Sequence, residues 1–210
     1  MDNLINFLIL GGALKNPHII DAFRVIDRAD FVPEEKRTEA YENYPIPIGY
    51  GQTISQPQTV AFMLEHLAPE EGNKILDVGS GSGWQTALLA HIVGPHGKII
   101  ALELIPELKE LGEKNAEKYG FVSEGRAEFH ALNAKDGFPL EAPFDRIIAA
   151  ASLPVRLVGA HVVRLTWKTE LKVGGRIVVP LGESIMLLKK KTDSLFEEHE
   201  FPGFLFVPFI

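Results

Sequence analysis

The sequence of 210 residues contains no cysteine. Without thiols the chain can form no disulfide, no thiolate zinc site and no cysteine nucleophile. The absence of disulfides fits a reducing compartment, and we expect a cytoplasmic location. The seven histidines are scattered, with no pair at i,i+4 beside a carboxylate. We therefore expect no metal site.

Positive charge is also scarce. The chain has 21 lysine and arginine residues against 28 aspartate and glutamate residues, which gives a net charge of −7. Binding to nucleic acid depends on clustered lysine and arginine that displace counterions from phosphates. The composition therefore argues against a nucleic-acid partner. The basic run Lys189–Lys191 is interpreted as a solvated strand edge that discourages pairing with another strand.

Long hydrophobic runs are missing as well. The apolar stretch 4–10 is too short to span a bilayer, and it follows Asp2 rather than the basic segment of a signal peptide. We expect no membrane partner. With 46% hydrophobic and 23% charged residues, the chain has the composition of an ordinary globular protein of one domain.

The sequence does contain a regular alternation of strand and helix patterns. The first forty residues show helical spacing of apolar side chains, and a further helix is predicted over 59–67. From there we predict strands at 74–79, 98–104, 127–132, 144–151, 175–181, 185–192 and 204–210, with helices at 84–93 and 106–120. This order predicts an α/β fold, a mainly parallel sheet with helices on both faces. We divide it into an N-terminal helical region and loop (1–58), a core (59–182) and C-terminal strands (183–210).

A glycine-rich loop, LDVGSGSGW, joins the first strand of the core to the next helix. Gly79, Gly81 and Gly83 alternate behind Asp77. Glycine allows a sharp turn and lets a ligand approach the unpaired N–H groups of a helix N-terminus. The dinucleotide pattern requires a further glycine where this chain has Trp84. The loop therefore argues against an NAD-dependent dehydrogenase.

A second acid, Glu103, ends the next predicted strand about 20 residues after the last glycine. A carboxylate at this place can accept hydrogen bonds from both hydroxyls of a ribose. Alone, the loop could be a tight turn and Glu103 a solvated strand end. Together they indicate an adenosine site without pyrophosphate geometry, which suits S-adenosylmethionine better than NAD.

The segment GYGQTISQP (49–57) places the hydroxyls of Thr53 and Ser55 and the amides of Gln52 and Gln56 between glycines and a proline. With this segment the chain resembles the protein-L-isoaspartate O-methyltransferase family. The resemblance covers most of the chain and includes IDRADFVPEE, PIPIGYGQTISQP, ILDVGSGSGWQTALLA, APFDRII, GGRIVVPLG and the terminal FVPF.

The resemblance implies a Rossmann-like class I methyltransferase fold with extra N-terminal helices and a modified C-terminal end. It implies transfer of a methyl group from S-adenosylmethionine to the α-carboxylate of L-isoaspartyl residues in damaged proteins. The methyl ester then closes to a succinimide, which reopens partly to normal aspartate. The implied partners are isoaspartyl-containing peptides and proteins, and the implied enzyme is a monomer.

The resemblance also implies roles for individual residues. Ser55 matches the active-site serine of the family. The predicted cofactor-binding residues, from the resemblance and the glycine loop, are Thr53, Ile54, Gln58, Asp77, Gly79, Ser80, Gly81, Gly83, Glu103, Leu104, Asn133 and Ala134.

Two features depart from the family pattern. Its Gly-Asp-Gly at the adenine end falls on Leu132, Asn133 and Ala134. Asn133 can accept a hydrogen bond from the adenine amino group but brings no charge. Ala134 costs backbone freedom if a positive φ is needed there. Gln58 stands where relatives often carry a ring.

The chemistry implied for Ser55 needs no general base. An α-carboxylate has an ordinary pKa of about 3.3–3.7 and is already ionised at neutral pH. A neutral hydroxyl can hold one oxygen of this nucleophile on the line of attack. One alternative is that Thr53 and Ser55 only cap the helix after Pro57. Two others are a methyltransferase for a small metabolite and a protein that binds the cofactor without turnover.

Overall fold

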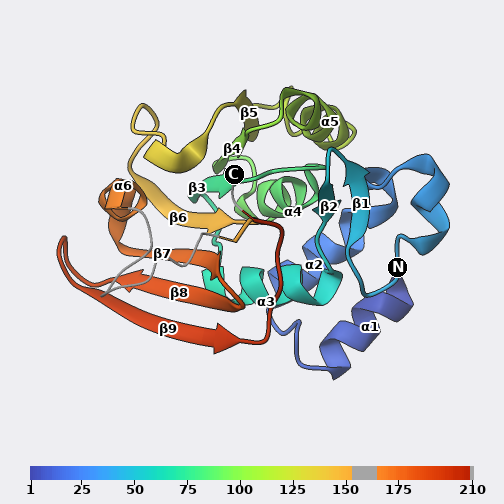
Figure 1. Cartoon of the computed structure of the whole chain (residues 1–210), viewed down its shortest axis with the longest axis horizontal. Helices are drawn as coiled ribbons and strands as arrows, with labels where there is room; N and C mark the ends of the chain where they lie inside the picture. Colours follow the sequence, from blue (N-terminus) through green and yellow to red (C-terminus); the bar gives the residue numbers. More distant parts are fainter. Residues whose placement is uncertain (153–164, 209–210) are drawn as a thin grey trace.

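A seven-stranded sheet forms the centre of the protein (Figure 1). The structure is a computed structural model that describes residues 1–152 and 165–208. The strand order is β5-β4-β3-β6-β7-β8-β9, parallel from β5 to β7 and antiparallel from β7 to β9. The strands are β3 (Lys74–Val78), β4 (Lys98–Glu103), β5 (Ala127–Ala131), β6 (Phe144–Ala149), β7 (Leu171–Leu181), β8 (Ser184–Lys190) and β9 (Phe196–Pro202). The predicted α/β sheet is confirmed.

Helices surround this sheet and make up most of the N-terminal region, as the apolar spacing predicts. Pro17 begins α2 and Pro57 begins α3, in the first turn of a helix, where a missing N–H is harmless. The helices are α1 (Asp2–Leu10), α2 (Pro17–Val25), α3 (Pro57–Leu67), α4 (Trp84–Val93), α5 (Pro106–Glu117) and α6 (Leu165–Glu170), with 3₁₀ turns η1 (Arg28–Phe31), η2 (Glu34–Glu39) and η3 (Ala134–Asp136).

Both faces of the central sheet are buried because successive residues of its inner strands are apolar. One face, which includes Ile75 and Ile99, packs in the larger core together with residues of α1 to α5. The opposite face, which includes Leu76, packs against Trp167 of α6 and Ala134 of η3. The predicted cover on both faces is therefore present, with most of the described helices on one side.

The segment 49–57 forms the turn and second strand of a hairpin, β1 (Ile46–Gly49) and β2 (Gln52–Ile54), and then enters α3. Gly49, Tyr50 and Gly51 all have positive φ, which is why two of the three are glycine. Ile46 pairs with Ile54. The hairpin therefore holds the polar residues that follow its turn in a defined register.

Two glycines let α4 and α5 approach closely. Gly83 precedes α4 with φ +84°, and a Cβ built there would lie 2.5 Å from the carbonyl oxygen of Gly112 in α5. A Cβ on Gly112 would in turn lie 2.9 Å from the carbonyl oxygen of Gly81. Both glycines are therefore required by packing between backbones, in addition to the turn that Gly83 makes.

The interpretation of the basic run Lys189–Lys191 as a solvated sheet edge is wrong. Strand β8 lies between β7 and β9, and Lys190 is only 4% exposed. Its ammonium group donates to the carbonyl oxygens of Leu171, at 2.7 Å, and Lys168, at 3.2 Å. The edge is instead β9, which carries three glutamates and a histidine. These charges hide its strand character in the sequence and discourage further pairing.

The end of the chain differs from the prediction of a strand over 204–210. Residues 204–208 contain only an isolated bridge between Pro208 and Ser152, and residues 209–210 lie outside the described part. Val207 accepts a hydrogen bond from Ser152 N at 2.8 Å, which ties this segment to the end of β6. Among the helices that the structure describes, none has the length and apolar character required to cross a membrane.

Candidate active site

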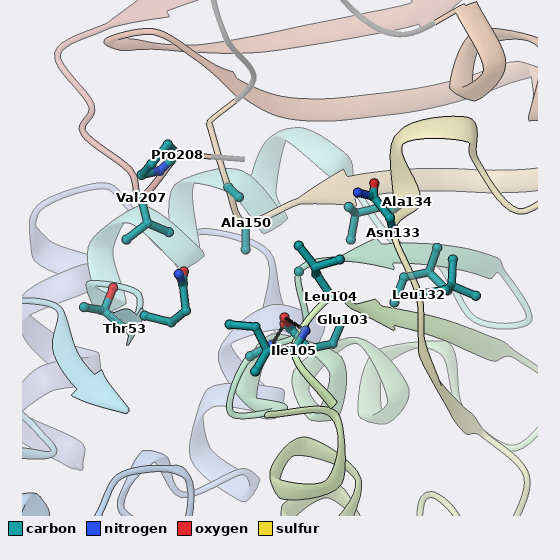
Figure 2. A pocket seen from close by; sticks show the side chains of 16 residues that line it. Thr53, Glu103, Leu104, Ile105, Leu132, Asn133, Ala134, Ala150, Val207 and Pro208 are labelled. Carbon is teal, nitrogen blue, oxygen red and sulfur yellow. Dashed lines mark hydrogen bonds between the residues drawn. The ribbon is translucent and has the colours of Figure 1, made fainter. Parts of the chain in front are cut away.

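A cavity opens where the strand order reverses, beyond the carboxyl ends of β3, β4 and β6. Ligands of open α/β sheets bind at such a point. Its walls leave about 620 Å³ of empty space, part of which is open to solvent. Figure 2 shows Thr53 and Val207 on one side, Asn133 and Ala134 on the other, and Glu103 between them.

Two further cavities continue from the first. The second shares Thr53, Gly79 and Gly81 with the first and reaches Ser55. The third shares Thr53 and Ser55 with the second and is bounded by Leu205–Val207. The three cavities together form a path from Glu103, past Ser55, to the C-terminal segment.

Glu103 is the polar centre of the first cavity. It is the last residue of β4 and is only 7% exposed. One carboxylate oxygen accepts a hydrogen bond from Gly81 N at 2.9 Å, and the other accepts one from Ile105 N at 3.1 Å. Each oxygen retains a further lone pair. The carboxylate is therefore held in a fixed orientation and can still accept hydroxyl donors from a ligand.

The opposite end of the cavity is formed by the turn around η3. The side-chain oxygen of Asn133 accepts from Lys135 N at 2.9 Å, and the residue is exposed on this turn. Ala134 does not have positive φ, since among non-glycine residues of the described chain only Tyr50 and Ala68 do. The predicted cost at Ala134 is therefore absent: alanine fits the 3₁₀ turn that this chain forms.

Helix α6 supports this turn from behind. The indole of Trp167, fully buried, donates to the carbonyl oxygen of Ala134 at 2.9 Å. The carboxylate of Glu170 accepts from Phe138 N at 2.9 Å, and burial raises the pKa of this carboxyl. Residues of the region 152–171, which the sequence pattern left unassigned, thus hold the far end of the cavity.

Asp77 lies beneath the glycine loop, not in the cavities. It is fully buried, and its carboxylate accepts from Gln85 Nε2 at 2.8 Å and from Thr86 Oγ1 at 2.6 Å. These bonds join the end of β3 to the first turn of α4, across the glycine loop. Burial raises the pKa of Asp77 to about 6, an effect that the two hydrogen bonds oppose and the nearby charge of Glu103 adds to.

The raised pKa of Asp77 predicts a pH-dependent stability. Between pH 3.8 and about 6 the unfolded state loses the proton while the folded state keeps it, so stability falls as the pH rises. Asp77→Asn removes this cost, which is at most about 3 kcal/mol, and can retain both hydrogen bonds. We expect a higher melting temperature than wild type at pH 7.5 and equal temperatures near pH 4. A variant that is less stable than wild type at both pH values would contradict this.

The other predicted cofactor residues, all within the described chain, fall into two groups. Those that line the first or second cavity are Thr53, Ile54, Gly79, Ser80, Gly81, Glu103, Leu104, Asn133 and Ala134. Gln58 lies outside the three cavities, and its side chain and main chain are both bonded to Asn43. Gly83 serves the contact between α4 and α5.

Ser55 lies at the junction of the second and third cavities. Its hydroxyl has no hydrogen-bond partner among the described residues, whereas its carbonyl oxygen accepts from Arg28 Nη2 at 3.1 Å. Helix α3 begins at Pro57 and makes no side-chain cap bond at Gln56. The alternative that Thr53 and Ser55 only cap this helix is therefore wrong.

Several lining residues were missed by sequence reasoning. The second cavity includes Val60, and the first includes Ala150 and Pro208. Apolar residues of this kind look like core in a sequence. Ala150 could have been identified from the predicted strand 144–151. That strand is parallel to the strand that precedes the glycine loop, so the carboxyl ends of both strands lie on the same side of the sheet.

The strand order, the glycine loop after β3 and the acid that ends β4 define a Rossmann-like fold of the class I methyltransferases. The family model for protein-L-isoaspartate(D-aspartate) O-methyltransferase matches residues 1–210. The chain belongs to this family.

Relatives and solved structures agree with this assignment. A protein-L-isoaspartate O-methyltransferase of Methanopyrus kandleri is 37% identical over 213 residues, which covers 100% of this chain and 90% of the relative. That of Aeropyrum pernix is 39% identical over 214 residues, covering 99% and 78%. A solved protein-L-isoaspartate O-methyltransferase has a TM-score of 0.84 at 26% identity, covering 99% of this chain and 65% of the other. A Plasmodium falciparum structure in complex with S-adenosyl-L-homocysteine has a TM-score of 0.86 at 21% identity, covering 99% and 97%.

Proposed function

We propose that this protein transfers a methyl group from S-adenosylmethionine to the α-carboxylate of L-isoaspartyl residues and thereby initiates repair through a succinimide. Membership of the family supports the reaction. The observation that carries the proposal for this chain is the unpartnered hydroxyl of Ser55. It stands between the cavity that contains Glu103 and the cavity that is bounded by the C-terminal segment.

The residues of the first cavity fit a nucleoside. Glu103 is positioned by two main-chain donors to accept the ribose hydroxyls. Asn133 offers an amide at the opposite end, and Leu104 and Leu132 supply apolar surface for a base. Gly79 and Gly81 bring main chain to the cavity wall. When bound, S-adenosylmethionine supplies an electrophilic methyl group.

Ser55 then has the task of orienting the nucleophile. A substrate carboxylate is already ionised at neutral pH, so no base has to remove a proton. The hydroxyl of Ser55 donates to one carboxylate oxygen and leaves the other to attack. A neutral donor suits this place, because an acid would repel the substrate carboxylate and a second cation would repel the sulfonium. The surrounding apolar residues Ile54, Val60 and Ala150 exclude water.

The reaction is tested with two peptides that differ only in aspartate or isoaspartate, incubated with S-adenosylmethionine labelled in the methyl group. Base-labile label in the isoaspartyl peptide alone supports the proposal. Equal labelling of both peptides indicates a broader carboxyl methyltransferase. Binding of the cofactor without label in either peptide favours the metabolite enzyme or the binding protein.

Ser55→Ala should lower kcat for the isoaspartyl peptide roughly ten- to a hundredfold, because a hydrogen bond to a charged group contributes about 1.5–3 kcal/mol. Affinity for S-adenosylhomocysteine, measured by calorimetry, should not change, since the hydroxyl faces the substrate. Ser123→Ala is a control: its hydroxyl donates to the carbonyl oxygen of Gly120, and the residue lines none of the three cavities. Equal activity of Ser55→Ala and wild type would exclude this role for Ser55.

A further inference from the structure

Arg28 is a buried cation without an acidic partner. Its side chain is 0% exposed. No ion pair joins it to an acid within the described residues, although 28 acidic residues are present in the chain. The acids that flank it are engaged elsewhere: Asp27 with Ala29 N and Asp30 with the hydroxyl of Tyr119. A buried charge of this kind is costly, and its presence requires an explanation.

The guanidinium group connects three parts of the active-site region through main-chain carbonyls. Nη1 donates to Ala40 O at 2.7 Å and to Glu42 O at 3.2 Å, and Nη2 donates to Tyr44 O at 3.0 Å. Nη2 also donates to Ser55 O at 3.1 Å. The fork thus joins η1, the segment that leads into the β1–β2 hairpin, and the residue proposed to orient the substrate.

The same guanidinium lies over an aromatic wall of the second cavity. Its central carbon is 5.3 Å from the centroid of the Trp84 ring, and Trp84 lines that cavity together with Ser55. Carbonyl oxygens and an indole face stabilise the cation but do not cancel its net charge. Burial lowers the pKa of Arg28 to about 10, so the group remains charged at neutral pH.

We propose that Arg28 is a positioning residue that fixes Ser55 and whose uncompensated charge makes the second cavity favourable for an anionic group, the α-carboxylate of the substrate. This inference rests on the proposed function. An acid paired with Arg28 would have cancelled the positive field of the guanidinium group. The carbonyl partners hold the guanidinium in place but do not cancel its charge, so the positive field persists. The charge acts through a low-dielectric region, where it is screened less than a surface charge.

Arg146 offers a matched control. It is 8% exposed and likewise donates to main-chain carbonyls, those of Leu67 and Ala68, at 2.9 and 3.0 Å. It lies by the end of α3, outside the cavities, and an acid, Glu70, stands 3.4 Å from it. Loss of Arg146 should therefore cost stability without changing how the active site distinguishes charges.

The test compares Arg28→Met, Arg28→Lys and Arg146→Met with wild type, each saturated with S-adenosylhomocysteine. Calorimetry measures the affinity for an isoaspartyl peptide and for the same peptide with its α-carboxylate replaced by a neutral carboxamide. The ratio of the two affinities reports on charge alone, because a general loss of structure lowers both. We expect Arg28→Met to reduce this ratio roughly tenfold. Arg146→Met and Arg28→Lys should keep it, with kcat lowered in Arg28→Lys because one ammonium cannot replace the fork.

Equal losses for both peptides in Arg28→Met, with the ratio unchanged, would overturn the inference and leave Arg28 a purely structural residue. If Arg28→Met does not fold, Arg28→Gln, which is neutral but keeps a hydrogen-bond donor, decides: a reduced ratio supports the role of the charge, and an unchanged ratio refutes it. Failure of the proposed function is seen separately, as absence of methyl transfer to the isoaspartyl peptide by the wild-type enzyme.

Discussion

Gly83→Ala should destabilise the protein by about 3 kcal/mol or more, the largest effect that we expect from a single methyl group. Alanine at φ +84° costs about 1–2 kcal/mol by itself. The added Cβ would also lie 2.5 Å from Gly112 O and 2.9 Å from Gly112 Cα. Main-chain atoms of a helix cannot move aside singly, so α5 must shift away from α4.

Thermal unfolding provides the measurement for Gly83→Ala. A loss of 3 kcal/mol corresponds to a fall in melting temperature of roughly 6–12 °C for a chain of this size. Gly125→Ala is the matched control, with φ +74° and no atom within 4 Å of the added Cβ. It should show only the backbone cost. Similar losses in the two variants would mean that the contact between the helices contributes little.

Glu103→Ala should weaken binding of S-adenosylhomocysteine roughly a hundredfold or more. Two hydroxyl donors to one carboxylate contribute about 1.5–3 kcal/mol each. The substitution also releases Gly81 N and Ile105 N, which the carboxylate now orients. Glu103→Gln should bind S-adenosylhomocysteine more tightly than Glu103→Ala but less tightly than wild type, because its NH₂ group must face one of these two N–H donors.

Calorimetry measures this affinity, with Glu107→Gln as the control for net charge. Glu107 is an exposed acid in the first turn of α5 and lines none of the three cavities formed by described residues. Its loss should leave the affinity within about twofold of wild type. A Glu103→Ala variant that binds as tightly as this control would remove Glu103 from the cofactor site.

The parallel core was predictable because its signals are local. The strand at β3, the glycine loop and helix α4 follow one another directly in the chain, and α4 begins at Trp84 as the pattern predicts. The place of Glu103, at the carboxyl end of β4 beside the glycine loop, follows from the same regularity. Residues whose type and spacing alone indicate a ligand could therefore be named from sequence.

The remaining features depend on contacts between distant segments. Nothing in the sequence near Arg28 shows that its partners are carbonyl oxygens up to 27 residues away. Lys190 looks like a surface residue until β9 covers its strand. The second role of Gly83 becomes visible only when α5 lies against it. Sequence periodicity predicts which residues are buried, but it does not predict which segments they contact.

The support that α6 gives to the turn around η3 has a thermodynamic consequence. Trp167 and Glu170 hold the same turn whose Asn133 faces the first cavity. Coupling between two such places is reciprocal. If the ordered turn favours binding of a nucleoside, then binding stabilises α6 against local opening by the same free energy. A helix outside the cavity thus becomes a reporter of occupancy, through the rate at which its amide protons exchange with solvent.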